Sequence, residues 1–98
     1  EEEMGIRVAQ MLSYPMVNDY ITLGNGDYIV EVTASDNMNG QTIKDVLREQ
    51  MDDVQVLLVK RRGQTTIQPD ADFALHAKDL LILLGQLQAL RTAAPKLV

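Results

Sequence analysis

The sequence predicts a small α+β domain with a mixed or antiparallel sheet, in the order strand, helix, hairpin, strand, preceded by a linker helix. Two aliphatic runs, at residues 54–60 and 80–84, are rich in strand-forming residues and end at turn signals. A segment at about 42–51 precedes both runs, and its apolar residues recur at helical spacing. A chain of 98 residues has room for one domain and one modest core.

The first twelve residues have the pattern of an amphipathic helix. Its apolar residues recur at i, i+4, i+7 and i+8: Met4, Val8, Met11 and Leu12. Pro15 ends this pattern, because the residue before a proline is disfavoured in the helical region. Residues 16–27 are then expected to form a connector, which closes in the turn sequence Gly24-Asn25-Gly26-Asp27.

The sheet is expected to begin with a strand at 28–33, followed by a polar loop at 35–41 and the helix at 42–51. Thr42 and Asp45 have the spacing of a capping box, which places the start of the helix. The apolar stripe of this helix consists of Ile43, Val46, Leu47 and Met51.

The second half of the chain reads as a hairpin and a final strand. The strand at 54–60 turns at 61–64 into a shorter strand at 65–68. The strand at 80–84 is closed by Gly85, and residues 86–93 are long enough for one or two helical turns.

The strands at 54–59 and 80–84 are apolar on successive residues, not only on alternate ones. A strand with one face in water alternates, so both strands are expected to be covered on both faces. One small helix covers one face. The other needs a second layer, from this chain or from a copy of it.

Composition excludes several classes of function. The formal net charge is −5, and the only basic cluster, Lys60-Arg61-Arg62, reads as a solvated turn, so a nucleic-acid binder is not expected. The longest aliphatic run, Leu80 to Leu84, is far too short to cross a bilayer, and the acidic start is unlike a secretory signal. These features indicate a cytoplasmic domain without membrane insertion of its own.

Catalytic and metal-binding patterns are not found. The chain has no Cys, and its single His76 has no second His to share a metal. Asp70, Asp72 and Asp79 lack the spacing of a calcium loop. No nucleophile has a plausible base, so we expect neither an enzyme nor a metal site.

With these elements in order, the stretch from Tyr28 to Leu90 resembles the TrkA-C or RCK-C domain family, the C-terminal regulatory lobe of potassium channel or Trk/Ktr-type potassium transport subunits. Three stretches carry the resemblance. Gly40 to Leu47 fits a Gly-x-Thr-Ile helix entry, and Val54 to Gly63 fits a Val-x-Val-x-x-Val-x-Arg-x-Gly strand. Pro69 and Asp72 precede Leu75-His76-Ala77-Lys78-Asp79, the aliphatic strand and Gly85, where the family has Leu-x-x-Gly-Asp before the strand. Lys78 departs from the family's Gly, which puts the type of this turn in doubt.

The resemblance implies a division of the chain and a function. Residues 1–27 would be the crossover helix and linker from a missing nucleotide-binding N-terminal lobe, 28–93 the TrkA-C/RCK-C domain, and 94–98 a frayed tail. The domain would pair as a homodimer at the cytoplasmic face of the membrane. There it would couple the binding of a ligand, a cyclic dinucleotide or a divalent cation, to a membrane pore or transporter.

The residues that we assign to this ligand lie in the polar loop and at the helix entry, where free N–H groups suit an anion. They are Ser35, Asp36, Asn37, Asn39, Gln41 and Thr42. The alternative is that this loop merely turns the chain and caps the helix. Two further alternatives concern the whole module: the same domain on a sodium/proton antiporter, an anion symporter or a transcription regulator, and a dimerisation domain that binds no ligand.

Overall fold

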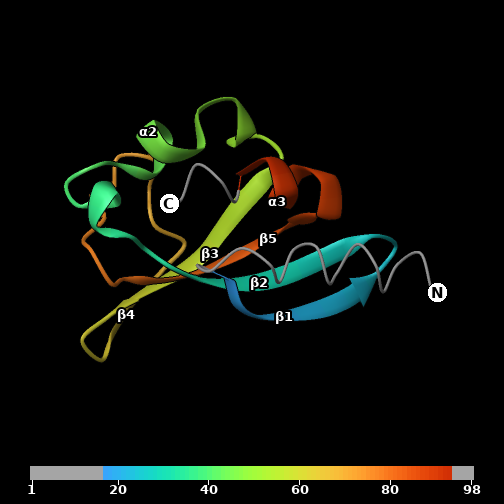
Figure 1. Ribbon diagram of the computed structural model, residues 1–98, viewed down its shortest axis with the longest axis horizontal. Coiled ribbons are helices and arrows are strands. Elements are labelled where there is room, and N and C mark those ends of the chain that lie inside the picture. Colours follow the sequence, from blue (N-terminus) through green and yellow to red (C-terminus); the bar gives the residue numbers. More distant parts are fainter. Residues whose placement is uncertain (1–16, 94–98) are drawn as a thin grey trace.

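The computed structural model describes residues 17–93, which form one antiparallel sheet with two helices (Figure 1). The strand order is β1-β2-β5-β3-β4, so β5 is the central strand. The strands are β1 (Val17–Gly24), β2 (Asp27–Thr33), β3 (Val54–Arg61), β4 (Gln64–Ile67) and β5 (Leu80–Gln86). The helices are α2 (Ile43–Leu47) and α3 (Leu87–Ala93), with short 3-10 turns η1 (Asp36–Met38) and η2 (Arg48–Gln50). The expected α+β class is confirmed; the linker helix expected over 1–12 lies outside the described residues.

Residues 17–24 correct the prediction of a connector, because they form strand β1. A two-residue turn at Asn25 and Gly26, with φ of 55° and 84°, joins β1 to β2 as a hairpin. The pairing register shifts between Val17 and Asp19 and again before Gly24. These irregularities interrupt the alternation of apolar and polar residues by which a strand is found in a sequence.

Helix α2 begins where the sequence predicts and ends earlier. The N–H of Asp45 donates to Thr42 Oγ1 at 3.1 Å, and the N–H of Thr42 donates to Asp45 Oδ2 at 3.2 Å, which completes the predicted capping box. The helix ends at Leu47 because Arg48 has φ 51° and ψ −117°, a backbone conformation outside the helical region. The chain continues through η2 in place of the helix predicted to residue 51.

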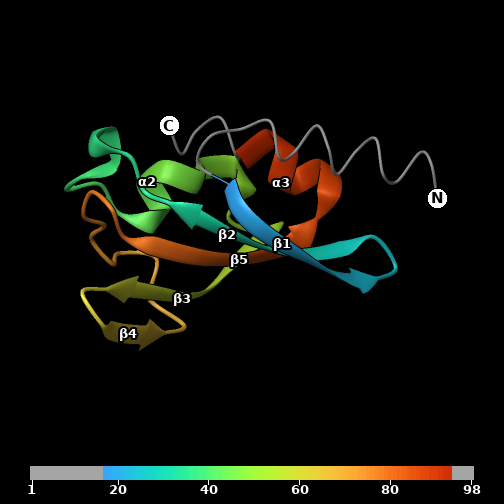
Figure 2. The same cartoon turned by 60° about the horizontal axis from the view of Figure 1, so that its bottom comes forward.

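The core lies between the sheet and the two helices, which Figure 2 shows on the same side of the sheet. Strands β2 and β5 turn alternate residues toward this side, and the helices close it with their apolar residues. The buried apolar members are Tyr28, Val30, Val32, Leu81 and Leu83 from these strands, Ile43, Val46 and Leu47 from α2, and Leu87, Leu90 and Ala93 from α3.

The opposite side of the sheet, called the open face below, is aliphatic but not covered by either helix. Along β5 the residues Leu80, Ile82 and Leu84 are only half-buried, in alternation with the buried ones. Within residues 17–93 the sheet is therefore covered on one face, although the sequence predicts cover on both. The second layer, if a copy of the chain supplies it, stays a prediction.

A buried ion pair fixes the loop that leads into β5. Asp79 is 1% exposed and receives two hydrogen bonds from Arg61 of β3: Nε to Oδ1 at 2.9 Å and Nη2 to Oδ2 at 2.8 Å. The N–H of His76 also donates to Oδ2, at 2.9 Å. Burial raises the pKa of Asp79, but these hydrogen bonds outweigh it and hold that pKa below its usual range. The same bond raises the pKa of Arg61.

The turn before Asp79 keeps its shape without glycine. Lys78 has φ 73°, and its N–H donates to the carbonyl of Ala34 at 2.9 Å. A left-handed conformation strains a residue that carries a Cβ atom. The turn before Asp79 therefore forms with Lys78 in place of the family's glycine, and Lys78 is strained there.

Gly85 lies in the middle of a close backbone contact, not at the end of its strand. A Cβ atom at this position would stand 2.9 Å from the backbone oxygen of Asp53, closer than real Cβ atoms approach. Strand β5 continues past it to Gln86.

Replacing Gly85 by alanine is therefore expected to lower the free energy of unfolding by about 2 kcal/mol, because the start of β3 must move. Chemical denaturation measures this change. Gln86→Ala, at the exposed neighbouring position, is the control and should stay within about 0.5 kcal/mol of wild type. Equal stability of the Gly85→Ala variant and wild type would show that the close contact has no effect.

Lys78→Gly is expected to stabilise the domain by about 0.5–1 kcal/mol, because glycine relieves the left-handed strain. Thermal unfolding should show a higher Tm. Lys44→Gly, at an exposed helical position, serves as the matched control and should lose about 1 kcal/mol. If both variants lose stability, Lys78 is not strained.

Asp79→Asn is expected to lower the free energy of unfolding at neutral pH by about 3 kcal/mol, because it leaves the charge of Arg61 without its partner. The pKa of Asp79 is depressed in the folded state, so the pair stabilises the fold fully above the unfolded value of about 3.9. Its contribution is lost as pH falls from there through the folded pKa. Unfolding curves of both proteins across this range should converge at the acid end.

The control for this substitution is Asp72→Asn, whose carboxylate pairs with Lys44 at 3.5 Å on an open surface. It should change stability by less than about 1 kcal/mol. A stability difference between Asp79→Asn and wild type that persists unchanged to the acid limit would contradict the assigned role of the carboxylate.

Candidate functional site

The six predicted ligand residues all lie in the segment that joins β2 to α2. Ser35 precedes η1, Asp36 and Asn37 form it, and Asn39 follows it. Gln41 and Thr42 stand directly before α2. The residues are thus close neighbours along one loop, as the sequence predicts, and the question is which of their polar groups are available.

Three of the six use their side chains within the chain. Asn39 Oδ1 accepts from the N–H of Ala77 at 3.2 Å, and Gln41 Nε2 donates to the carbonyl of Asn37 at 2.9 Å. Thr42 caps α2. These contacts agree with the alternative in which the loop turns the chain and caps the helix.

The N-terminus of α2 also has no free first-turn donors. The N–H of Ile43 donates to the carbonyl of Phe73 at 3.1 Å, and that of Lys44 to the carbonyl of Ala71 at 2.9 Å. Asp45 accepts the Thr42 N–H, and this hydrogen bond, first among the causes, lowers the pKa of Asp45. The free N–H groups on which the sequence argument for an anion depends therefore already have partners.

Asp36 and Asn37 remain available. Both are exposed, and neither side chain has a hydrogen bond within residues 17–93. Ser35 differs from them, because its Oγ is buried and has no hydrogen-bond partner in the described part of the chain. The loop therefore offers two exposed polar side chains and one buried hydroxyl.

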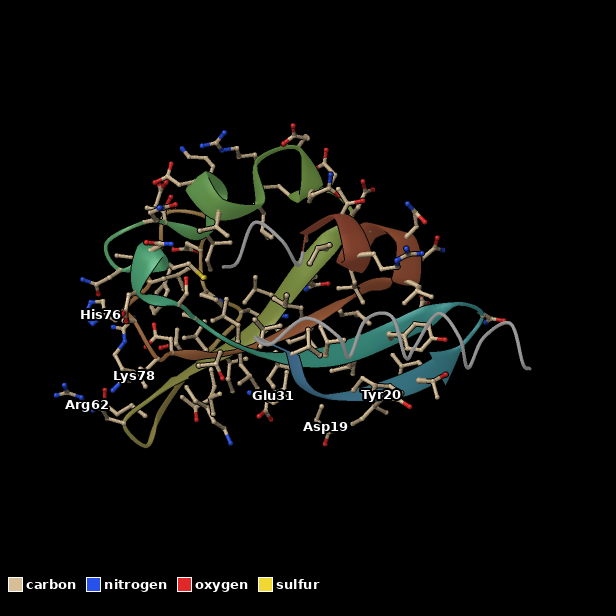
Figure 3. The ribbon with its side chains drawn as sticks, viewed as in Figure 1. Asp19, Tyr20, Glu31, Arg62, His76 and Lys78 are labelled. Carbon is tan, nitrogen blue, oxygen red and sulfur yellow. The ribbon has the colours of Figure 1, made fainter. Side chains whose placement is uncertain are left out.

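The fold brings basic side chains to this loop, which the sequence argument did not include. Figure 3 shows Arg62, His76 and Lys78 at the same end of the domain. All three are exposed. The N–H of Ala77, between His76 and Lys78, bonds to Asn39, so this segment packs directly against the polar loop. We call these three residues and the loop residues Asp36 and Asn37 the basic end.

The sequence contains a partial signal for the basic end. Lys60, Arg61 and Arg62 are adjacent in it, and together they predict a solvated turn. The structure separates them: Arg61 points to the buried Asp79, while Lys60 lies on the open face and Arg62 at the turn. His76 and Lys78 stand far away in the chain, so only the fold shows that they join Arg62.

A groove of about 720 Å³ lies elsewhere, beside the part of β3 that β4 does not reach. Val54 and Val56 line it from the strand, and Ile43 and Leu47 from the helix. Its charged lining residues are Asp27, Asp52 and Asp53. Three carboxylates and no cation make this groove unfavourable for a phosphate group.

Residues 17–93 show neither a metal-binding cluster nor a membrane-spanning helix. Among residues 17–93, no three His, Cys, Asp or Glu side chains gather closely enough to hold a metal ion. None of the helices in that range has the length and apolar character that a bilayer crossing requires.

Comparison with known proteins gives similar sequences in potassium uptake systems. The Ktr system potassium uptake protein A of Vibrio alginolyticus is 33% identical over 85 residues, which cover 87% of this chain and 39% of that protein. Protein C of the same system in Bacillus subtilis is 27% identical over 85 residues, covering 87% of this chain and 38% of that protein. The chain thus spans about two fifths of the length of these curated relatives.

Solved structures also share the fold of this chain. The RCK C domain of the potassium transport protein KtrA, solved in complex with cyclic diadenosine monophosphate, aligns with a TM-score of 0.61 and 29% identity, over 87% of this chain and 93% of that chain. The GsuK channel bound to NAD aligns with a TM-score of 0.63 over 76% of this chain and 14% of that chain. At 22% identity, the second likeness shows the fold alone.

The family assignment follows from the extent of the match. Residues 28–98 match the TrkA-C domain, which is well over half of the chain. The helix entry, the Arg61 strand and the Asp79 loop that carry the resemblance in the sequence are also the parts that the fold joins. This chain belongs to the TrkA-C domain family.

Proposed function

We propose that this chain is the ligand-sensing regulatory lobe of a potassium uptake system or potassium channel. The observation that carries the proposal is its likeness, over nearly its whole length, to a KtrA RCK C domain solved with a cyclic dinucleotide. In the complete protein the lobe stands at the cytoplasmic face, is linked to a nucleotide-binding N-terminal lobe, and pairs with a second copy of itself. The proposal assigns it no catalytic step.

The mechanism is a shift between two arrangements of the paired lobes. A ligand changes their relative population only if it binds one arrangement more tightly than the other. Contacts that reach both the ligand and the sheet then pass this preference to the linked N-terminal lobes and the pore. A coupling of 1–3 kcal/mol, or about 5–150-fold in affinity, is typical of such systems.

We assign the ligand to the basic end. A cyclic dinucleotide carries two phosphates, and Arg62 and Lys78 bring two positive charges together there, beside His76, on a chain of net charge −5. Asn37 adds a side-chain amide that has no hydrogen bond within residues 17–93. The groove beside β3 has three carboxylates and no cation, so it supports a phosphate ligand less well.

Titration of the chain with cyclic diadenosine monophosphate, NAD and divalent cations, followed by calorimetry, tests this assignment. We expect the cyclic dinucleotide to bind. Arg62→Gln, which removes a phosphate-binding charge, should weaken that binding about tenfold. Arg91→Gln removes the same charge from α3 and should leave the affinity unchanged.

A wrong function and a wrong site would give different results in this titration. If none of the compounds binds, the sensing function is wrong and only a dimerisation role remains. If the cyclic dinucleotide binds and Arg62→Gln has no effect, the basic end is not its site. Asp52→Ala, a change in the lining of the groove, then tests the groove.

A further inference from the structure

The open face carries a row of residues that crosses all five strands. The pairing register places Asp19 of β1 next to Glu31 of β2, Glu31 next to Ile82 of β5, Ile82 next to Leu58 of β3, and Leu58 next to Ile67 of β4. Facing residues in paired strands share one side of the sheet. The row is therefore acidic at the β1–β2 side and aliphatic over the rest.

Neighbouring rows extend the aliphatic surface. Ile21, Ile29 and Leu84 form the next row in one direction, and Leu80 lies in the row on the other side. Ile21 and Ile67 are 59% and 72% exposed. A continuous aliphatic surface of this kind is usually an interface, since it is costly to leave in water.

The acidic side of the face brings two carboxylates together. Asp19 and Glu31 are directly opposite each other, and Figure 3 shows them close together. Like charges in this position repel. Their hydrogen bonds come from neutral groups, the N–H of Tyr20 to Asp19 and Asn18 Nδ2 to Glu31. Within residues 17–93 neither carboxylate has an ion pair, so a cation from outside would relieve the repulsion.

Among the described residues, the open face has a lysine on the other side of β5. Lys60 of β3 pairs with Leu80, one row away from Glu31, and is exposed without an ion pair in the described residues. The face thus has carboxylates on one side of the central strand, a lysine on the other, and aliphatic residues between them. This arrangement is complementary to itself after a half-turn.

The strand order allows two ways to pack one copy on another. A twofold axis that runs along β5 places β2 of each copy over β3 of the other, because the order β1-β2-β5-β3-β4 is balanced about β5. An axis across the strands places β1 and β2 of one copy over β1 and β2 of the other. The first brings acids over lysine, and the second brings acids over acids. Charge therefore selects the first.

We infer that a second copy of this chain covers the open face, with the twofold axis along β5, so that Glu31 of each copy pairs with Lys60 of the other. Packed sheets stand about 10 Å apart, and one row is about 6.7 Å along a strand, which the long side chains of Glu and Lys span. The inference rests on the pairing of lobes in the proposed function, and it names the surface and the orientation.

Charge reversal tests the orientation, with the dissociation constant of the dimer measured by analytical ultracentrifugation. Glu31→Lys alone and Lys60→Glu alone should each weaken the dimer about tenfold, because each change acts twice in a symmetric dimer. The double variant restores the opposite charges and should recover the wild-type constant within about threefold. Recovery by the double variant also shows that the single changes leave the fold intact.

Lys44→Glu combined with Asp72→Lys is the matched control, since this pair lies outside the open face and exchanges the same charges. It should leave the dimer unchanged. A dimer that responds to none of these variants overturns the inferred surface and leaves the pairing of lobes in place. A chain that stays monomeric at roughly 1 mM, where even a dimer with a dissociation constant near 1 mM would be partly populated, overturns the pairing itself.

Disulfide cross-linking gives a second test of the orientation, because the chain has no Cys of its own. In the inferred orientation β1 lies over β4, so a mixture of Asp19→Cys and Ile67→Cys proteins should form mixed disulfide dimers. Asp19→Cys alone should not cross-link with itself. Efficient self-cross-linking of Asp19→Cys would instead establish the axis across the strands and contradict the inference.

Discussion

The pair of Arg61 and Asp79 determines the geometry of one whole end of this domain. The side chain of Asp79 binds β3 through Arg61, and its carbonyl accepts from the N–H of Ala34 at the end of β2. Because Asp79 also leads directly into β5, one residue connects the three central strands. The guanidinium lies 5.2 Å from the ring centroid of Phe73 and donates to the carbonyl of Ala74, so the loop before β5 is held as well. The pair is costly to break from the Arg61 side, since the charge of Asp79, which is 1% exposed, would then be left without a partner or solvent.

This pair also relates the basic end to the sheet. Arg62 follows Arg61, and His76 and Lys78 stand on the loop that Asp79 anchors, so a ligand at the site that we propose would act on residues already tied to β2, β3 and β5. The open face consists of the same strands. A change at the basic end therefore has a short path to the surface on which we place the second copy. Such a path transmits a preference only if the paired lobes have two arrangements of similar free energy.

The sequence predicts the elements whose apolar spacing is regular, and fails where the backbone departs from it. The strands at 28–33, 54–60 and 80–84 appear nearly as expected, since their side chains fill a core of their own. Strand β1 was missed because bulges break its alternation, although Asn25-Gly26 is a strong hairpin signal. The predicted helix is too long, because nothing in the sequence indicates that the backbone of Arg48 has a positive φ. For the site, the sequence identifies a polar loop but not its neighbours: His76 and Lys78 reach it only through the fold, and the helix donors are used by a segment thirty residues away.

Helix α2 has only five residues, fewer than an isolated helix needs to persist in water. Its first donors bond to the carbonyls of Phe73 and Ala71, and Thr42 forms a β-bridge with Ala74. We therefore expect the helix and this loop to open and close as one cooperative unit. In such a unit the release of a few loop contacts unfolds a helix, so a small change of contact becomes a large change of conformational entropy. Regulation through this lobe can thus act by how much of the chain is ordered, with little movement of the sheet.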